Sequence, residues 1–171
     1  DMEVLPDVNA CAGNNVTVFF IGTVGAGFSW TNSNPAIGLP ASGTGNRLDF
    51  TSANAGNSPD TALLTVTPTI GNCVGTARSF RIVVTPSPSV DSIPDLSVCA
   101  GQTVKVNFAG SGNPLFSWTN DNTATGLDAG GNGNIDFTAA TVGTNQNSVV
   151  TVVPRSGVCQ GTAQSFQLTV L

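Results

Sequence analysis

Four cysteines are the residues whose type and spacing point most directly to chemistry in this 171-residue chain: Cys11, Cys73, Cys99 and Cys159. None of them forms a Cys-x-x-Cys arrangement, and the chain contains no histidine. Zinc sites normally require such a spacing or histidine partners. The cysteines therefore indicate disulfide bonds, which in turn indicate an oxidising compartment outside the cytoplasm.

The lack of histidine also removes the usual general base and the Ser-His-Asp and Cys-His nucleophile systems. Paired carboxylates or a Ser-Lys couple remain available, because the chain has ten acidic residues and one lysine, Lys105. That lysine, however, lies in an alternating run typical of a strand. We therefore expect a protein that is not an enzyme.

The stretch from Asp121 to Asp136 is the richest in oxygen ligands, with Asp121, Asp128, Asp136 and several asparagines. Calcium takes six to eight oxygen ligands, so these residues are the calcium candidates and calcium is the one candidate cofactor. The alternative is an ordinary turn rich in Asn and Gly. This alternative is favoured because the first half of the chain offers only Asp49 in place of the three.

The chain repeats itself over nearly its whole length. FSWTN occurs at 28–32 and again at 116–120, LPDVNACAGNNVTVFF is matched by IPDLSVCAGQTVKVNF, and CVGTARSFRIVV is matched by CQGTAQSFQLTV. A period of this length indicates whole domains in tandem, because solenoid repeats are only about 20 to 50 residues long. The sequence predicts two domains, residues 1–86 and 87–171.

Four cysteines allow three pairings. Only the pairing within a copy, Cys11 with Cys73 and Cys99 with Cys159, would occur twice in the same way. Each bridge would close a loop of about 60 residues and stabilise its domain by about 4 kcal/mol in the chain-entropy model. It would tie the start of the second strand of a domain to the start of the last strand.

Apolar residues alternate with polar ones in short runs, which predicts strands and no helix. Val16, Val18 and Phe20 form one such face, and Phe80, Ile82 and Val84 form another. With about seven short strands in each copy, the fold class is all-β, with two Greek-key sandwiches. The other expected strands are Val4–Val8, Phe28–Thr31, Leu48–Thr51 and Leu63–Thr67, the last of them ended by Pro68.

The large apolar side chains are assigned by the same alternation. Trp30 and Trp118 would stand mid-strand and fill the space between two sheets, where an indole buries well over about 100 Å². Phe19 and Ile21 point to the opposite face of their strand. Either a loop covers that face or it forms an apolar patch that meets a neighbour, and we expect the covered face.

Charge and composition limit the partners. Only 9% of the residues are charged, the net charge is −5, and the five basic residues are scattered. This pattern excludes nucleic acid, which requires a basic stripe. No apolar run of about 18 residues exists, so we expect no membrane insertion. No leader precedes Asp1, which indicates a mature or excised fragment.

The join between the copies, TPSPSVDSIPD from Thr85 to Asp95, contains three prolines and no glycine. Such segments favour extended, polyproline-like geometry. We therefore expect a semi-rigid spacer and a rod-like pair whose first partners are neighbouring repeats of the same chain.

The CAG, FSWTN and C-x-G-T motifs and the Gly-x-Gly-Asn turn resemble the PKD-like, immunoglobulin-like repeats found in tandem in very large surface proteins of Bacteroidetes, including gliding-motility-associated adhesins. The resemblance covers both copies. It implies non-catalytic spacers or adhesive stalks, exported by type IX secretion, with surface glycans or proteins as further partners. Two features depart from the pattern: Trp30 and Trp118 are followed by Thr-Asn instead of the usual PKD turn, and the chain lacks the tyrosine of antibody-type domains.

Two triplets are similar to the O-glycosylation sequon used by Bacteroidetes. They are Asp60-Thr61-Ala62 and Asp91-Ser92-Ile93. Ser92 is the better candidate because the join should be exposed, whereas Thr61 leads into a strand. The alternative for both residues is an unmodified hydroxyl.

Two functions follow from these observations. The first is a tandem-repeat segment of a large bacterial cell-surface adhesin or filamentous surface protein, extracellular, acting as a semi-rigid stalk or adhesive module. The second is an accessory carbohydrate- or protein-binding module of a secreted hydrolase.

Overall fold

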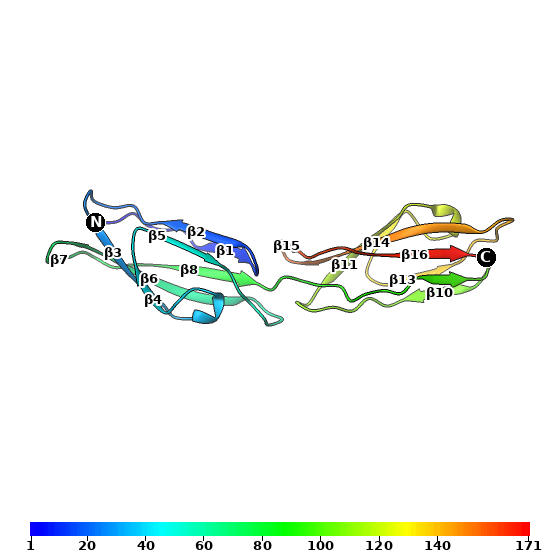
Figure 1. Cartoon of the computed structure of the whole chain (residues 1–171), viewed down its shortest axis with the longest axis horizontal. Helices are drawn as coiled ribbons and strands as arrows, with labels where there is room; N and C mark the ends of the chain where they lie inside the picture. The colour runs from blue at the N-terminus through cyan, green and yellow to red at the C-terminus, as the bar shows by residue number, and fades with distance from the viewer. The chain divides into compact units, whose positions relative to one another are not determined.

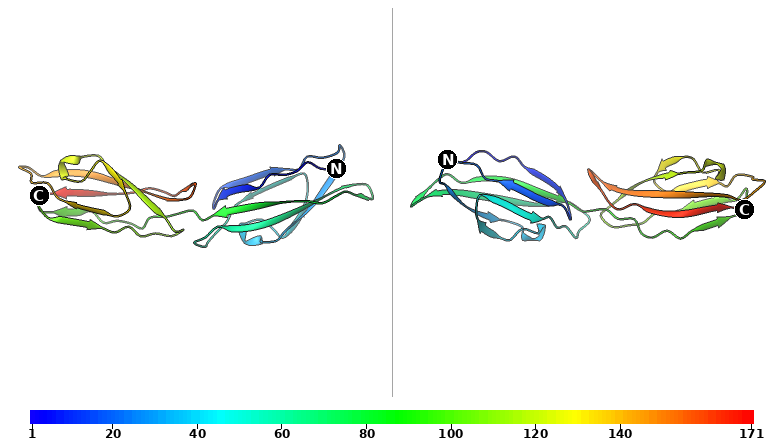
Figure 2. Two further views of the ribbon diagram at one scale, coloured as in Figure 1. Left: turned by 180° about the vertical axis from the view of Figure 1, so that it is seen from behind. Right: turned by 45° about the horizontal axis from the view of Figure 1, so that its top comes forward.

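The computed structural model describes residues 1–171 and divides into two compact units, Asp1–Ser87 and Pro88–Leu171. Both units consist of strands and irregular connections, with one short 3-10 turn in each. Figure 1 and Figure 2 show the strands of each unit gathered into its own layered body.

The first unit has a large and a small sheet. The large sheet has the order β1-β8-β6-β3-β4, with β7 added to β6, and β2 pairs with β5 in the small sheet. Strand β1 runs parallel to β8, and the other pairs are antiparallel. The elements are β1 (Val8–Cys11), β2 (Asn15–Phe19), β3 (Gly27–Asn32), the 3-10 turn (Pro35–Ile37), β4 (Ser42–Thr44), β5 (Arg47–Thr51), β6 (Asp60–Ile70), β7 (Cys73–Val74) and β8 (Arg78–Thr85).

The second unit repeats this topology. Its large sheet has the order β9-β16-β14-β11-β12, with β15 on β14, and its small sheet pairs β10 with β13. Strand β9 is again parallel to the last strand, β16. The elements are β9 (Leu96–Val98), β10 (Thr103–Val106), β11 (Leu115–Asn120), the 3-10 turn (Thr123–Thr125), β12 (Gly130–Asn132), β13 (Ile135–Thr138), β14 (Gln146–Ser156), β15 (Cys159–Gln160) and β16 (Gln164–Val170).

Each unit has its own hydrophobic core between the two sheets. In the first unit the inward positions of β6 and β8 alternate with exposed or half-buried ones, and Leu64, Val66 and Ile82 are completely buried. Leu48 of β5 covers them from the small sheet. The all-β fold expected from the period-two pattern is confirmed, because that alternation gives each sheet one apolar face to bury.

The prolines expected to end a strand lie inside one. Pro68 is part of β6, opposite Phe28, and Pro154 occupies the same place in β14. The carbonyl oxygen of Pro68 accepts a hydrogen bond from the Gly75 amide at 2.8 Å. Strand β7 ends at Val74 and β8 begins at Arg78, so Pro68 lies opposite the gap between these two strands. Its missing N–H therefore costs no regular hydrogen bond of the sheet.

Two other expectations about the first unit are wrong. The leading strand is Val8–Cys11 instead of Val4–Val8, since the chain before it makes only an isolated bridge from Met2 to Gly22. The face of Phe19 and Ile21 is open, because these side chains are 58% and 56% exposed.

Candidate functional site

The FSWTN motif builds the centre of each core. In β3, Phe28, Trp30 and Asn32 point inward, while Ser29 and Thr31 point outward. Trp30 is 8% exposed, and its indole lies against Gly43 of the paired strand β4. A Cβ at that glycine would collide with the ring. Trp30 is therefore a packing residue, and its ring fits only because position 43 is a glycine.

The second unit uses the same arrangement. Trp118 of β11 is also 8% exposed and lies against Gly131 of β12. Neither indole nitrogen has a hydrogen-bond partner. These two rings pack between the sheets and offer no exposed stacking platform for a ligand.

The asparagine that ends the motif holds a loop, a role that the sequence analysis missed. The side-chain amide of Asn32 donates to the carbonyl oxygen of Leu39 at 2.8 Å, and its oxygen accepts from the Asn34 amide at 3.0 Å. In the second unit Asn120 donates to the Leu127 carbonyl at 2.9 Å. Its place at an inward strand position was the available signal, because a buried amide must find partners.

The aspartates suggested for calcium are not brought together. Asp136 of β13 forms an ion pair with Lys105 at 2.8 Å, and Asp121 accepts a hydrogen bond from the Val149 amide at 2.8 Å. Asp128 lies exposed before β12. No three acidic or cysteine side chains cluster so that they could hold a metal ion. The stretch forms turns and short strands, which fits the alternative of an ordinary turn region rich in Asn and Gly.

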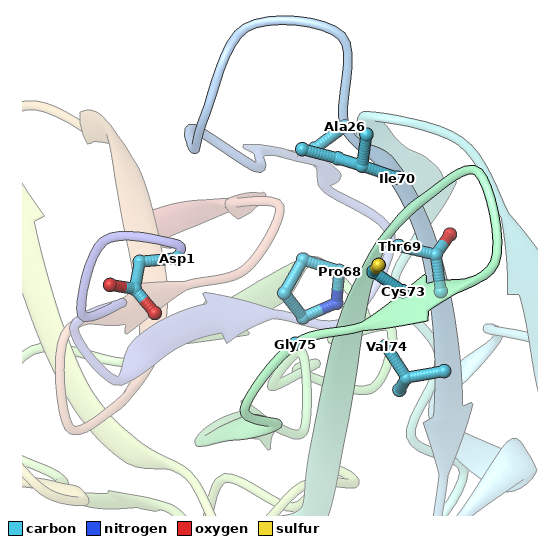
Figure 3. A pocket seen from close by; sticks show the side chains of 8 residues that line it. All are labelled: Asp1, Ala26, Pro68, Thr69, Ile70, Cys73, Val74 and Gly75. Carbon is cyan, nitrogen blue, oxygen red and sulfur yellow. The ribbon is translucent and has the colours of Figure 1, made fainter.

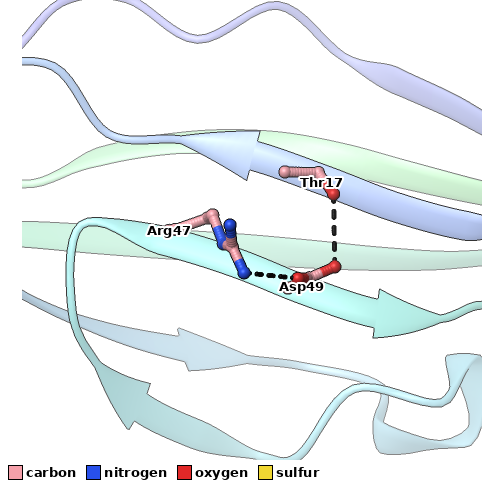
Figure 4. A network of polar contacts seen from close by, with 3 residues as sticks. All are labelled: Thr17, Arg47 and Asp49. Atoms are coloured by element: carbon pink, nitrogen blue, oxygen red, sulfur yellow. Dashed lines mark hydrogen bonds and ion pairs between the residues drawn. The ribbon is translucent and has the colours of Figure 1, made fainter.

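Asp136 and its counterpart in the first unit, Asp49, have different partners. Asp49 of β5 accepts a hydrogen bond from Thr17 at 3.2 Å and pairs with Arg47 at 2.6 Å (Figure 4). Thr17 and Lys105 occupy the same register position opposite these aspartates. Hydrogen bonding to Asp136, followed by its negative charge, raises the pKa of Lys105 above its ordinary value.

A further aspartate in each unit has a structural role that sequence reasoning did not find. Asp7, just before β1, accepts a hydrogen bond from the Arg81 amide of β8 at 2.7 Å. Asp95 accepts one from the Gln167 amide of β16 at the same distance. Each carboxylate extends the ladder by one bond at the point where the parallel strand has not yet begun.

The cysteines depart most from expectation. Cys11 and Cys159 are disulfide-bonded, whereas Cys73 and Cys99 are free and exposed. The pairing of Cys11 with Cys73 and of Cys99 with Cys159 is therefore wrong.

The physical reason is distance within each unit. Cys11 lies opposite Thr85 at the end of β8, whereas Cys73 pairs with Ile70 at the other end of β6. Along β6 about ten residues separate the two places, or about 30 Å at the rise of a strand. A disulfide needs Cα atoms within about 7 Å.

The second unit has the same geometry. Cys99 adjoins the last residues of β16, and the next amide, that of Ala100, donates to the carbonyl oxygen of Leu171. Cys159 pairs with Ser156 at the opposite end of β14. The spacing between the two cysteines is nearly the same in both units, but the strands between them keep them apart.

A small hollow adjoins Cys73 at the β6–β7 end of the first unit (Figure 3). Its volume is about 160 Å³, and the residues that line it include Asp1, Pro68 and Ile70. Ile70 and Val74 are exposed there. The first residue of the unit and its second cysteine thus lie at the same end.

The two candidate glycosylation residues are both exposed. Ser92 lies in the segment before β9, and Thr61 lies in β6, where its carbonyl oxygen accepts a long hydrogen bond from Asn34. Glycosylation of either hydroxyl stays a prediction.

No protein-family model matches the chain, and no curated protein matches it. Solved structures of tandem immunoglobulin domains do. Sidekick-1 immunoglobulin domains 1–4 match with a TM-score of 0.56 at 14% identity, over 100% of this chain and 48% of that chain. A titin I-band fragment gives 0.56 at 11% identity, over 99% and 64%. The insect immune protein hemolin gives 0.52 at 16% identity, over 98% and 45%.

At these identities the similarity shows the fold. Both units are immunoglobulin-like sandwiches arranged in tandem, as in these neighbours. This chain spans about half to two thirds of the length of the three neighbours. Its structure has no helix of sufficient length and apolarity to cross a bilayer.

Proposed function

We propose that this chain is a non-catalytic tandem-repeat segment of a large bacterial cell-surface adhesin or filamentous surface protein, where it acts as a semi-rigid stalk or adhesive module. The observation that carries the proposal is the path of the chain through each unit. In the first unit Asp1 lies beside Cys73 at one end, and Thr85 ends β8 at the other. A unit crossed from end to end is suited to forming linear arrays.

The connection between the units is shorter than the proline-rich stretch suggested. Strand β8 ends at Thr85, and by Ser89 the chain is already hydrogen-bonded within the second unit, to the carbonyl oxygen of Ser111 at 3.0 Å. Asp91 continues this with a bond to Ala109. Three residues therefore connect the two units, two of them prolines. Short proline-containing connections restrict bending, which supports a stalk.

The hydrogen bonds of two carboxylates support a structural role. Asp7 accepts from the Arg81 amide of β8, and Asp95 accepts from the Gln167 amide of β16. The resemblance to repeats of Bacteroidetes adhesins, which implies type IX export, supports an extracellular, surface-attached protein. The presence of disulfide-bonded cysteines supports the same location.

Small-angle scattering tests the stalk. We expect the intact chain to show a maximum dimension close to the summed lengths of its two units, with little change between low and high salt because few charges are present. The matched control carries eight Gly and Ser residues inserted between Ser87 and Pro88, which should broaden the distance distribution. Equal, broad distributions for both proteins would contradict a semi-rigid stalk.

One observation favours the second function, an accessory binding module of a secreted hydrolase. Phe19 is an exposed aromatic ring on β2, and Ile21 and Val24, which follow it in sequence, are also exposed. Aromatic rings that face solvent are common contacts for sugars and for apolar protein patches. Saccharide binding on a glycan array that is lost in Phe19→Ala, and kept in the matched Asn107→Ala, would favour this function over the stalk.

A further inference from the structure

The outer edge of β2 has no neighbouring strand. Strand β2 pairs with β5 alone, in a sheet of two strands. The Phe20 amide donates to the carbonyl oxygen of Asn46 at 2.8 Å, which places the even-numbered residues of this antiparallel pair in hydrogen-bonded positions. The backbone N–H and C=O groups of Asn15, Thr17 and Phe19 therefore point away from β5, and no hydrogen bond occupies them.

The chain before β1 covers this edge at one end. The Glu3 amide donates to the carbonyl oxygen of Ile21 at 2.9 Å. The chain then crosses to β1, which runs beside β8 in the large sheet. The edge is thus covered beyond Phe19, whereas Asn15, Thr17 and Phe19 keep their backbone groups free. These three residues form the open edge.

The open edge suits strand pairing and carries no net charge. Its three side chains are exposed, and threonine and phenylalanine favour strands. The charges opposite it on β5, Arg47 and Asp49, form an ion pair with each other, and Asp49 also accepts a hydrogen bond from Thr17 (Figure 4). Nothing in this arrangement repels an identical edge.

The second unit carries a lysine at the equivalent place. Strand β10 pairs with β13 alone, and its Lys105 occupies the position of Thr17 with a side chain that is 68% exposed. Natural sheets often protect an open edge with a lysine, because a charged side chain opposes pairing with another strand. The two repeats thus share the same backbone edge, and the first lacks this protection.

We propose that the open edge binds the open edge of a second copy of this chain, antiparallel and about a two-fold axis at Thr17. In this register Thr17 faces Thr17 of the second copy, and Asn15 of each copy faces Phe19 of the other. Each facing pair exchanges two backbone hydrogen bonds. This register is the one in which all three residues of the open edge have a partner. The contact is isologous, so it closes with two copies.

Charge explains why the pairing is specific to the first unit. A two-fold axis at Thr17 brings two neutral side chains together. The same axis in the second unit would place two Lys105 ammonium groups directly opposite each other, where like charges destabilise a strand pair. A second copy of the first unit is therefore the occupant that matches the open edge in length, register and charge.

Sedimentation equilibrium over a range of protein concentrations tests the proposal, in a Cys73→Ser, Cys99→Ser background that removes dimers linked by the free thiols. Three residue pairs make a small contact, so we expect a weak equilibrium between monomer and dimer. Thr17→Lys should weaken the dimer about fivefold or more, and added salt should restore part of the loss by screening the two lysines. The matched control Thr31→Lys, at an exposed position of β3, should leave the dimer unchanged.

Folding of the Thr17→Lys variant is checked by circular dichroism, and the Lys105–Asp136 pair of the second unit shows that a lysine fits this position. A monomer at every concentration up to millimolar protein would overturn the proposal. So would a dimer that Thr17→Lys leaves as tight as the parent.

Nuclear magnetic resonance of a mixture of differently labelled copies checks the register. Pairing about Thr17 sets Val16 of one copy opposite Val18 of the other in a non-hydrogen-bonded pair, where Cα atoms lie about 4.5 Å apart. We expect an intermolecular nuclear Overhauser effect between their Hα atoms, and intermolecular contacts elsewhere without this one would contradict the register. The proposal is independent of the stalk, because scattering from dilute, monomeric protein tests the stalk whether or not the dimer forms.

Discussion

The two repeats are nearly the same on the inside and different on the outside. Each seats an indole against a glycine of the neighbouring strand and holds a loop with a buried asparagine amide. On the outside, Asn107 of the second repeat stands where the first has Phe19. Asp49 of the first repeat pairs with Arg47, whereas its counterpart Asp136 pairs with Lys105. The inward residues are constrained by packing against several neighbours at once, whereas an outward residue has to satisfy only water and a neighbour on its own sheet.

The core tryptophans should dominate stability in both repeats. Trp30→Ala and Trp118→Ala each remove the largest ring of a core, so we expect the free energy of unfolding of the affected unit to fall by about 3–5 kcal/mol. Urea unfolding followed by circular dichroism measures the loss, and fluorescence of the remaining tryptophan reports the unaltered unit. Phe in place of either Trp should cost less, since it also removes an indole N–H that has no partner. Equal stability of Trp30→Ala and the parent would contradict the packing role.

This core was accessible from the sequence. Period-two alternation around Trp30 and Phe80 places apolar side chains on one face of each strand, and the repeat of FSWTN shows that the requirement occurs once per domain. The local rule works because burial depends on which face a residue occupies, which alternation specifies directly.

The buried asparagines should rank second. Asn32→Ala and Asn120→Ala leave the buried carbonyl oxygens of Leu39 and Leu127 without their donors, which costs about 1–3 kcal/mol each. The exposed Asn9 of β1 supplies the control, and Asn9→Ala should change stability by less than about 0.5 kcal/mol. Thermal unfolding of the three variants checks this order. A similar loss for all three would mean that the amide contacts contribute nothing specific.

The exposed face of β2 should be tolerant. Phe19 is 58% exposed, so we expect Phe19→Asp to leave a soluble, monodisperse protein within about 0.5 kcal/mol of the parent. The neighbouring Phe20, whose ring packs 5.7 Å from that of Phe28, gives the contrast, because Phe20→Asp buries a charge and should unfold the first unit. Size-exclusion chromatography and urea unfolding of both variants measure the difference. Unfolding of the Phe19 variant would restore the covered face expected from sequence.

The cysteine pairing could not be obtained from sequence in the same way. A repeat in the sequence makes pairing within each copy the simplest choice, but pairing depends on distance through the fold. Cys11 and Cys73 are set apart by the length of β6, a strand that runs through Pro68 to Ile70. The calcium candidates Asp121 and Asp136 show the same limit, since closeness in sequence does not place them in one cluster.

The charged pairs on the small sheets should give the smallest effect, and one that differs between repeats at high pH. Asp136 raises the pKa of Lys105, so the pair stabilises the folded second unit below the ordinary lysine pKa and loses this contribution as pH rises through the raised value. Arg47 stays charged throughout, so its pair with Asp49 should persist. We therefore expect the difference in urea midpoint between the parent and Lys105→Met to shrink between about pH 9 and pH 12, while the difference between the parent and Arg47→Met stays constant over that range. Both series belong in a Cys73→Ser, Cys99→Ser background, which removes alkaline exchange at the free thiols. Parallel curves for the two variants would show that the lysine pair contributes nothing that titrates.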